Sequence, residues 1–519
     1  MTVPDVSVLV AVYNTMPYLT ECLDSLVAQT IGPERLQIVA VDDGSTDTSG
    51  AELDRYAARH PGLFTVVHQP NSGGPARPFN RGLDAATGRY VFFLGADDHL
   101  GPDALRRLVE AADRWESDVV LGRVVGVNSR HIYQDIFAST QADVDLYDSP
   151  LPRSLANTKL FRRALLDKHA IRYREDLPLG SDLPFTLAAC FHARRISVLA
   201  DYDYYFAVRR HQATNITYLS RHADRLRTVE ATTAYVAELI PAGRRRDAVL
   251  ARRFDHEIAK LLEDDLLALD RETQELVHAG IGRLVRTHLT DAIAAELNAE
   301  TRIRLALTRD GSVDDLLAVI RQDAEIGVPP TVVEGERRYA AYPGFRGAGG
   351  PPDEVFEVTG VPDWSAKLDA TALAWETDEQ GDRVLTVTAK RTDAGPLAVS
   401  AEEIPGDVTP LDDTTLRIRF RVADLLANTP RTGRRRAVSA QPGEFDPTRA
   451  VGAATATGAA GAAAVRAPGV HTTNPLVRRR GTRLFVVTPV RDTSGRLMVS
   501  VVPVTAARVT AQLRRALRR

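Results

Sequence analysis

Two pairs of adjacent aspartates follow short apolar runs near the start of the chain. Asp42-Asp43 comes after the run 36–41, and Asp97-Asp98 comes after the run 90–94. Carboxylates in such places can hydrogen-bond the edge of a nucleotide base. They can also hold a divalent cation against a diphosphate, whose charge must be neutralised as a bond to it breaks. Both pairs could instead cap the helices that follow, because aspartate is favoured at helix N-caps.

The elements that must position these pairs can be predicted from the apolar pattern. The runs 6–12, 36–41, 65–67 and 90–94 are nearly continuous and are separated by stretches with helical spacing. Such runs are typical of strands buried in a parallel sheet. Ligands of these sheets bind at the carboxyl ends of the strands, where the polar clusters lie. We therefore expect an α/β domain with a mostly parallel, Rossmann-like sheet in residues 1–215.

Five motifs follow one another in this region, at residues 8–14, 39–47, 71–75, 80–83 and 92–98. In order and spacing the series resembles the inverting nucleotide-sugar glycosyltransferases of family 2. The resemblance implies a GT-A catalytic domain, a UDP-sugar donor and a divalent metal, Mn²⁺ or Mg²⁺. It also implies that an aspartate at position 42 or 43 meets the uracil. The residues expected to bind the nucleotide sugar are Ala11, Tyr13, Asn14, Asp42, Asp43, Asn71, Arg77, Ala96, Asp97 and Asp98.

The sequence departs from the family pattern at two of these motifs. The metal motif of the family is usually Asp-x-Asp-Asp, and Gly95 replaces its first aspartate. The resemblance then makes Asp97 the main metal ligand. His211 is a further ligand, a donor to the diphosphate, or a loop histidine with no role in the site. Phe79 stands where family members carry an arginine near the diphosphate. Arg77 either substitutes for that arginine or is a plain surface residue.

An inverting transfer needs a carboxylate that accepts the proton of the attacking hydroxyl. The family places this base as the aspartate of a Glu-Asp-like pair, and Ser181-Asp182 matches that place with serine for glutamate. The resemblance therefore makes Asp182 the expected base. Asp176 is the competing carboxylate, and a helix N-cap at Asp182 is the structural alternative.

The chain changes character twice after the catalytic region. Residues 216–326 carry apolar residues at helical spacing and predict a helical extension, whereas residues 327–353 have the Pro and Gly content of a linker. Beyond them, alternating patterns predict all-β, immunoglobulin-like sandwich domains at 354–427 and 428–519. Arginine triplets at 434–436 and 478–480 are read as solvated faces or as sites for a polyanion.

The composition excludes several classes of protein. The 519 residues carry 65 Lys plus Arg against 68 Asp plus Glu, and the net charge of -3 gives no reason to expect nucleic-acid binding. No apolar run reaches the ~20 residues that span a bilayer. The two cysteines, Cys22 and Cys190, suit a reducing compartment. We expect a soluble cytoplasmic protein, with peripheral association at the inner membrane face as an option.

The layout of catalytic domain, helices and β domains resembles the cytosolic enzymes that glycosylate wall teichoic acid. This resemblance implies transfer of N-acetylglucosamine or a related hexose to an anionic cell-wall glycopolymer, and a homotrimer formed through the C-terminal domains. Two alternatives stay open. One is a capsule or exopolysaccharide transferase that uses a lipid-linked acceptor, and the other is a catalytically weak scaffold that binds polymer.

Overall fold

The computed structural model divides into two compact units, Met1–Glu263 with Leu269–Ala295, and Asp264–Ala268 with Glu296–Arg519. The structure describes residues 3–128, 130, 132–177, 179–210, 221–325, 329–347, 350–359, 368–391, 397–412, 414–427, 429, 434–442, 463–465, 476–480, 483–491 and 497–504.

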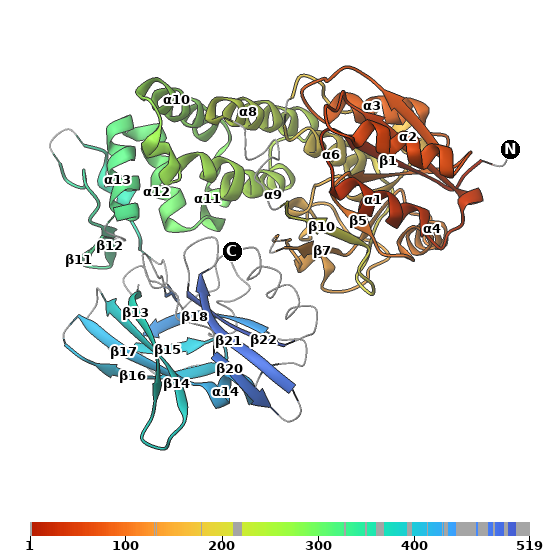
Figure 1. Ribbon diagram of the computed structural model, residues 1–519. Coiled ribbons are helices and arrows are strands. Elements are labelled where there is room, and N and C mark those ends of the chain that lie inside the picture. Colours follow the sequence, from red (N-terminus) through yellow and green to blue (C-terminus); the bar gives the residue numbers. More distant parts are fainter. Residues whose placement is uncertain are drawn as a thin grey trace. The chain divides into compact units, whose positions relative to one another are not determined.

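A seven-stranded sheet forms the centre of the first unit (Figure 1). Its order in the described residues is β3-β2-β1-β4-β8-β6-β9. Strand β1 is parallel to β2 and β4, whereas β8 is antiparallel to β4 and β6. The strands are β1 (Val6–Val12), β2 (Leu36–Asp42), β3 (Phe64–His68), β4 (Tyr90–Gly95), β6 (Val119–Gly122), β8 (Lys159–Arg162) and β9 (Ile196–Leu199). The mostly parallel sheet predicted from the apolar runs is confirmed.

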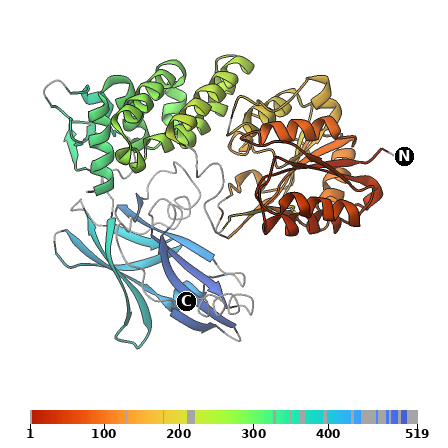
Figure 2. The same ribbon diagram turned by 45° about the horizontal axis from the view of Figure 1, so that its top comes forward.

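Helices cover both faces of this sheet (Figure 2). The chain passes from β1 to β2 and β3, and then returns to β4 on the other side of β1. Right-handed crossovers therefore put α1 and α2 on one face and α3 on the other. The direction of strand addition reverses between β1 and β4, and open α/β sheets bind ligands at such a switch point. The helices are α1 (Tyr18–Val27), α2 (Ser49–Arg59), α3 (Ala76–Ala85), α4 (Ala104–Arg114), α5 (Arg163–Lys168) and α6 (Asp182–His192).

A second, smaller sheet lies at the end of β4. It has the order β5-β10-β7, formed by β5 (His99–Leu100), β10 (Tyr205–Val208) and β7 (Val124–Val127). Strand β10 is antiparallel to β5. Because β5 directly follows Asp97-Asp98, this pairing brings β10 onto the acidic pair.

Helices follow the catalytic region, as the spacing of apolar residues predicts. In the first unit they are α8 (His222–Leu239), α9 (Arg244–Arg252), the π-helical turn η4 (Arg253–Ile258), η5 (Ala259–Leu262) and α10 (Arg271–His288), and α11 (Asp291–Glu296) ends at its limit. In the second unit η6 (Asp264–Ala268), α12 (Ala299–Asp310) and α13 (Val313–Glu325) continue the helical part. None of the helices that the structure describes is long and apolar enough to cross a membrane. The predicted domain limits at residues 215, 326 and 353 stay predictions.

The rest of the second unit is almost entirely β, as predicted. After the hairpin of β11 (Thr331–Glu334) and β12 (Arg337–Ala340) and the turn η7 (Asp353–Phe356), the described strands pair in one path, β13-β14-β17-β16-β15-β18-β22-β21-β20, with β19 beside β18. Their bounds are β13 (Leu368–Thr377), β14 (Arg383–Arg391), β15 (Leu397–Ala401), β16 (Ile404–Pro410), β17 (Thr415–Arg421), β18 (Arg434–Pro442), β19 (Ala463–Ala464), β20 (Leu476–Arg480), β21 (Arg483–Arg491) and β22 (Leu497–Pro503), and α14 (Val422–Ala427) lies between β17 and β18. One apolar core draws on strands from both sides of residue 428. The division into two immunoglobulin-like sandwiches stays a prediction.

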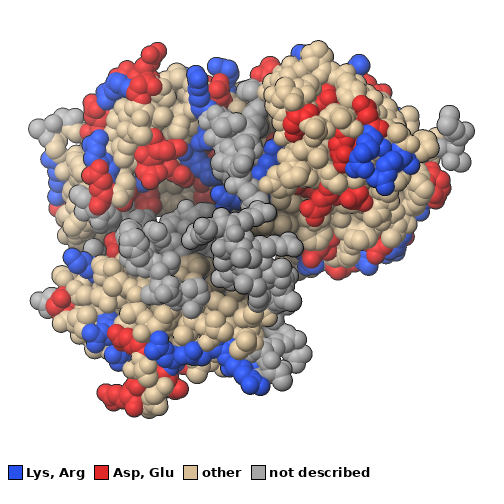
Figure 3. All heavy atoms as spheres, in the orientation of Figure 1, with Lys and Arg blue, Asp and Glu red and all other residues tan. Residues whose placement is uncertain are grey.

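Arg436 corrects our interpretation of the first arginine triplet. Its side chain is fully buried, donates to Thr429 Oγ1 at 3.0 Å and lies 3.3 Å from Glu403 Oε1. The triplet is therefore not a uniformly solvated or polymer-binding face, because β18 turns its third arginine into a polar niche of the core. On the face drawn in Figure 3, acidic and basic side chains are interspersed over both units.

Candidate active site

Asn14 ties the end of β1 to the loop after β2. Its Oδ1 accepts hydrogen bonds from the backbone N–H groups of Thr46 at 2.7 Å and Asp47 at 3.2 Å. Its own N–H donates to Ser45 Oγ at 3.1 Å. The neighbouring Tyr13 is 47% exposed and offers an aromatic wall at the strand end. Asn14 therefore fixes the loop after β2 against the end of β1.

Asp42 bridges the loop after β2 and the end of β3. Its Oδ1 accepts from the N–H of Ser45 at 3.0 Å, and its Oδ2 lies 2.9 Å from His68 Nδ1. The other ring nitrogen of His68 lies 3.1 Å from Asp54 Oδ1. The hydrogen bonds to these two carboxylates, with Asp42 the larger cause, raise the pKa of His68. An imidazolium can donate to both carboxylates at once, which fixes the orientation of Asp42.

Asp43 is buried and anchors the loop after β3. Its oxygens accept from Gln69 Nε2 at 2.6 Å, from the Ser72 N–H at 3.0 and 3.1 Å and from the Ser72 hydroxyl at 2.9 Å. Asn71 donates from its side chain to the Asp43 carbonyl at 3.1 Å. Gly44 has a φ of 74°, and a Cβ there would lie 2.6 Å from the Asn71 nitrogen. Five of the residues predicted to bind the nucleotide sugar thus lie together at the ends of β1, β2 and β3: Tyr13, Asn14, Asp42, Asp43 and Asn71.

Asp98 lies behind Asp97 and supports the second acidic cluster. Its Oδ2 accepts from the Tyr205 hydroxyl at 2.6 Å, and its Oδ1 accepts from the Val208 N–H at 2.7 Å. Arg130 adds an ion pair at 3.6 Å. Burial, followed by the charge of Asp97, raises the pKa of Asp98 to about 6. Both oxygens of Asp98 are engaged within the protein.

Asp97 stands at the switch point between β1 and β4. Its Oδ2 accepts from Arg210 Nε at 2.8 Å, and the two side chains are 14% and 16% exposed. Ala96 is buried between the acidic pair and β4, and Ala11 of β1 is the register partner of Gly95. A Cβ on Gly95 would lie 2.6 Å from Asp98 Oδ2. The Asp98 carboxylate therefore occupies the space that the side chain of an aspartate at position 95 would need.

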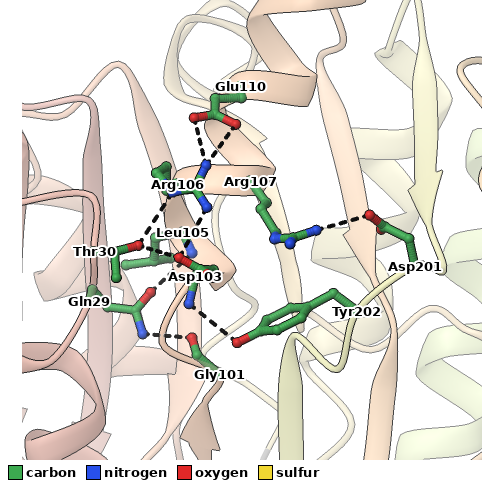
Figure 4. Close-up of polar contacts among 10 residues, drawn as sticks. All are labelled: Gln29, Thr30, Gly101, Asp103, Leu105, Arg106, Arg107, Glu110, Asp201 and Tyr202. Carbon is green, nitrogen blue, oxygen red and sulfur yellow. Dashed lines mark hydrogen bonds and ion pairs between the residues drawn. The ribbon is translucent and has the colours of Figure 1, made fainter.

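A hydrogen-bond network fixes the turn that follows the acidic pair (Figure 4). Gln29 Nε2 donates to the Gly101 carbonyl at 2.9 Å, and Thr30 Oγ1 donates to Asp103 Oδ1 at 2.6 Å. The Asp103 N–H donates to the Tyr202 hydroxyl at 3.3 Å. Helix α4 has Asp103 at its N-cap position, so the pair at 97 and 98 does not cap this helix.

The donor set fits a cation that binds together with a diphosphate. Among the described residues, no group of three or more His, Cys, Asp or Glu could hold a metal ion by itself. Mg²⁺ often takes only one or two protein carboxylates when substrate phosphates supply other oxygens. Asp97 offers such a carboxylate. His211, the other predicted ligand, lies outside the described residues.

Helix α3 explains the second departure from the family pattern. Phe79 is buried, with its ring centroid 5.2 Å from both Phe93 and Tyr173. An arginine would place a charge in this aromatic cluster, which is costly without a partner. Arg77 donates from Nε to Glu175 at 3.1 Å, in the segment that leads to α6. Its described contact is therefore with that segment.

Asp182 is the first residue of α6, and Ser181 takes the N-cap position. Burial raises the pKa of the Asp182 carboxyl, while backbone N–H groups of the first turn and the charges of Arg253 and Lys159 oppose that rise. A raised pKa suits a group that must accept a proton near neutral pH. Asp176 is half-exposed and lies 2.5 Å from Arg174, which lowers its pKa. The local chemistry thus favours Asp182 over Asp176 as a base.

Three polar residues of this region were not singled out as candidates from the sequence. His68 ends an apolar strand, Lys159 begins one, and Arg253 falls within a helical pattern. The sequence signal that could have identified them is an ionisable residue inside or at the edge of an otherwise apolar stretch. Their partners lie far away in the chain, so the sequence alone did not reveal their contacts.

Comparison with known proteins agrees with this fold. A glycosyl transferase family 2 domain matches residues 7–164, and a glycosyl transferase TarS linker domain matches residues 223–320. The match to glycosyl transferase family 2 covers the region that carries the five motifs.

Two curated relatives act on poly(ribitol phosphate), according to their names. The poly(ribitol-phosphate) beta-glucosyltransferase of Bacillus spizizenii is 38% identical over 205 residues, which cover 40% of this chain and 32% of that protein. The poly(ribitol-phosphate) beta-N-acetylglucosaminyltransferase TarS of Staphylococcus aureus strain Mu50 is 37% identical over 204 residues, covering 39% of this chain and 35% of that protein. The aligned part of the chain spans about a third of the length of these relatives.

Solved structures extend the likeness in fold to the rest of the chain. The crystal structure of S. aureus TarS matches with a TM-score of 0.62 at 21% identity, covering 97% of this chain and 86% of that one. At this identity the match shows the fold alone. Residues 1–349 of TarS in complex with UDP-GlcNAc match with a TM-score of 0.58 at 27% identity, covering 67% of this chain and 98% of that one.

Proposed function

We propose that this chain is an inverting glycosyltransferase that moves a sugar from a UDP-sugar to a hydroxyl of an anionic cell-wall glycopolymer of the teichoic-acid class. The sugar is N-acetylglucosamine or a related hexose. The family 2 domain, the names of the relatives and the likeness to TarS bound to UDP-GlcNAc support this proposal. The observation that carries it is the convergence of the β1, β2 and β3 ends with Asp97 at the switch point of the sheet.

The uridine would bind at the ends of β1 and β2. Tyr13 provides an exposed aromatic surface for the base. A carboxylate has about four acceptor positions, and the described contacts of Asp42 are those with Ser45 and His68. Asp42 therefore keeps capacity to accept the N–H of a uracil ring. Asp43 and Asn71 would hold the loop that closes this pocket.

The diphosphate would lie beside Asp97. A bound Mn²⁺ or Mg²⁺ would be held by Asp97 and by His211, and would neutralise the charge of the leaving diphosphate. Arg210 already places a guanidinium at Asp97, where it can bind phosphate oxygens. Asp98 would act indirectly, by fixing the turn through Tyr205 and Val208.

Asp182 would accept the proton of the attacking hydroxyl. The hydroxyl oxygen then forms a bond to the anomeric carbon as the bond from that carbon to the diphosphate breaks. One displacement of this kind inverts the anomeric configuration. The half-exposed Asp176, paired with Arg174, is the less suitable base.

The second unit would assemble the chain into a homotrimer through its β region. A repetitive polymer rewards several active sites on one particle, because a chain held at one site stays at high effective concentration for the others. Two free cysteines and the use of a nucleotide sugar are consistent with the proposed cytoplasmic location.

Titration calorimetry with Mn²⁺ tests the donor and the metal ligand. We expect UDP to bind more tightly than GDP, and Asp97→Asn to weaken metal-dependent UDP binding. Asp167→Asn, an exposed aspartate paired with Arg163 on α5, is the matched control and should bind UDP as the wild type does. Equal affinities for UDP and GDP would contradict the uridine assignment.

A further inference from the structure

Lys159 is a lysine buried at the start of β8. It is only 1% exposed, and its Nζ donates to the carbonyl oxygens of Ser154 and Ala156, each at 2.6 Å. These bonds fix the loop that precedes β8. A buried ammonium is costly unless hydrogen bonds and opposite charge compensate for its lost hydration. The two carbonyls accept from two of its three N–H groups, but they carry no net charge.

Helix α6, whose first residue is Asp182, packs on the strand that bears this ammonium. Lys159 and Phe161 share one face of the strand, because side chains alternate along it. Asp182 and Phe185 share one face of the helix, three residues apart. The rings of Phe161 and Phe185 touch with centroids 5.4 Å apart. Lys159 and Asp182 therefore lie along the same helix–strand contact. The charge of Asp182 raises the pKa of Lys159, and the charge of Lys159 lowers the pKa of Asp182.

One further cation faces Asp182 among the described groups that act on it. Arg253 of η4 donates to Thr232 Oγ1 on α8 at 2.6 Å and lies 3.6 Å from Glu257. The charge of Arg253 lowers the pKa of Asp182 more than that of Lys159 does, but Arg253 also pairs with Glu257. The described hydrogen bonds of Lys159 go to carbonyl oxygens.

The neighbouring Tyr173 and Cys190 are neutral at physiological pH. Burial raises the pKa of Tyr173 well above its usual range and raises the pKa of Cys190 to about 11. Neither group therefore adds a charge that competes with Lys159 for Asp182.

We propose that Lys159 is a positioning residue for the transfer reaction, whose buried ammonium keeps the Asp182 carboxyl ionised and ready to accept a proton. The proposal rests on the proposed function, in which Asp182 is the base. Lys159 itself transfers no proton. Burial lowers the pKa of Lys159 to about 8, so the ammonium is charged at neutral and acidic pH, where the ionisation of Asp182 limits the reaction.

The pH dependence of the transfer rate tests this role. Lys159→Gln keeps a donor for the loop carbonyls and removes the charge, and Lys159→Met removes both. At saturating donor, we expect both variants to shift the acidic limb of the rate profile upward by ~1 pH unit. The rate on the plateau above that limb and the KM for the donor should stay close to the wild-type values. Lys168→Met, at an exposed lysine of α5, is the control and should leave the limb in place.

A purely structural role predicts a different profile. If Lys159 only builds the loop, Lys159→Gln lowers the rate by the same factor at every pH, and this result overturns the proposal. If Lys159→Met does not fold, Lys159→Gln still decides between the two outcomes.

A thermal unfolding cycle measures the coupling without using activity. The free energy of unfolding of wild type minus that of Asp182→Asn should vary with pH, because only the wild type carries the titrating carboxyl. We expect the pH range of this variation to lie higher when both proteins also carry Lys159→Gln. An unmoved pH dependence overturns the proposal. Wild-type turnover in Asp182→Asn would show that the base was misassigned, and the unfolding cycle distinguishes that failure from a failure of the Lys159 inference.

Discussion

Asp98 couples the active-site turn to pH. Its pKa is raised from 3.8 to about 6, first by burial and then by Asp97. A carboxyl with a raised pKa stabilises the fold in its protonated form. That contribution is fully present below the unfolded pKa and is lost as the pH rises through the folded pKa. About two pH units at ~1.4 kcal/mol each give on the order of 3 kcal/mol.

Asp98→Asn should therefore gain stability relative to the wild type as the pH rises. We expect the stability difference, variant minus wild type, to increase by on the order of 3 kcal/mol between about pH 4 and about pH 7. Thermal unfolding of both proteins across this range measures it. Asp103→Asn is the control, because the pKa of Asp103 is lowered by Thr30 and Arg106 and its ionisation changes little in this range. A flat difference for Asp98→Asn would contradict the environment described for this carboxyl.

Gly95 should resist even a methyl group. A Cβ at this position would lie 2.6 Å from Asp98 Oδ2, and that carboxylate is held by Tyr205 and Val208. We expect Gly95→Ala to cost ~1–3 kcal/mol of stability and to weaken UDP binding, because the turn bearing Asp97 must shift. Gly62→Ala measures the cost of replacing a glycine with a positive φ and open space around it. Tighter metal-dependent binding in Gly95→Ala would show that the turn adapts freely.

At the scale of elements, the pairing of β5 with β10 completes the site. Tyr205 accepts from the Gly95 N–H at 3.0 Å and donates to Asp98 at 2.6 Å, so one hydroxyl joins β4, the acidic turn and β10. Tyr205→Phe leaves the Gly95 N–H and the buried Asp98 carboxylate each without that partner. We expect a loss of ~1–3 kcal/mol in thermal unfolding. Tyr13→Phe, at an exposed tyrosine, should unfold like the wild type, and an equally stable Tyr205→Phe would refute this role.

The elements of the catalytic domain were predictable because its strands are continuous apolar runs whose ends carry the polar residues. Gathering these ends at one edge of the sheet needs only the parallel topology. The contacts that refine the site were not predictable, because they join residues far apart in the chain. Tyr205 donates a hydrogen bond to Asp98, which lies 107 residues earlier in the chain. Lys159 and Asp182 influence each other's pKa because a helix packs on a strand. Arg436 was missed for a similar reason, since its partners Glu403 and Thr429 lie outside the strand that bears it.

For the molecule as a whole, we predict assembly through the second unit. We expect light scattering to give a trimer for the full chain and a monomer for residues 1–345, because the β region would supply the interface. The crystal structures of TarS residues 1–349 support the use of such a fragment. A monomeric full chain would contradict the trimer, and an oligomeric fragment would move the interface to the catalytic or helical part.

We propose that this chain transfers a sugar from a UDP-sugar to a polyol-phosphate polymer with Asp182 as the base. Wild type and Asp182→Asn can be compared for UDP-GlcNAc binding by calorimetry and for transfer to poly(ribitol phosphate) in the presence of Mn²⁺. We expect equal donor affinity and a ~10²–10⁴-fold loss of transfer in the variant. Near-wild-type transfer by Asp182→Asn, or no transfer by the wild type, would contradict the proposal.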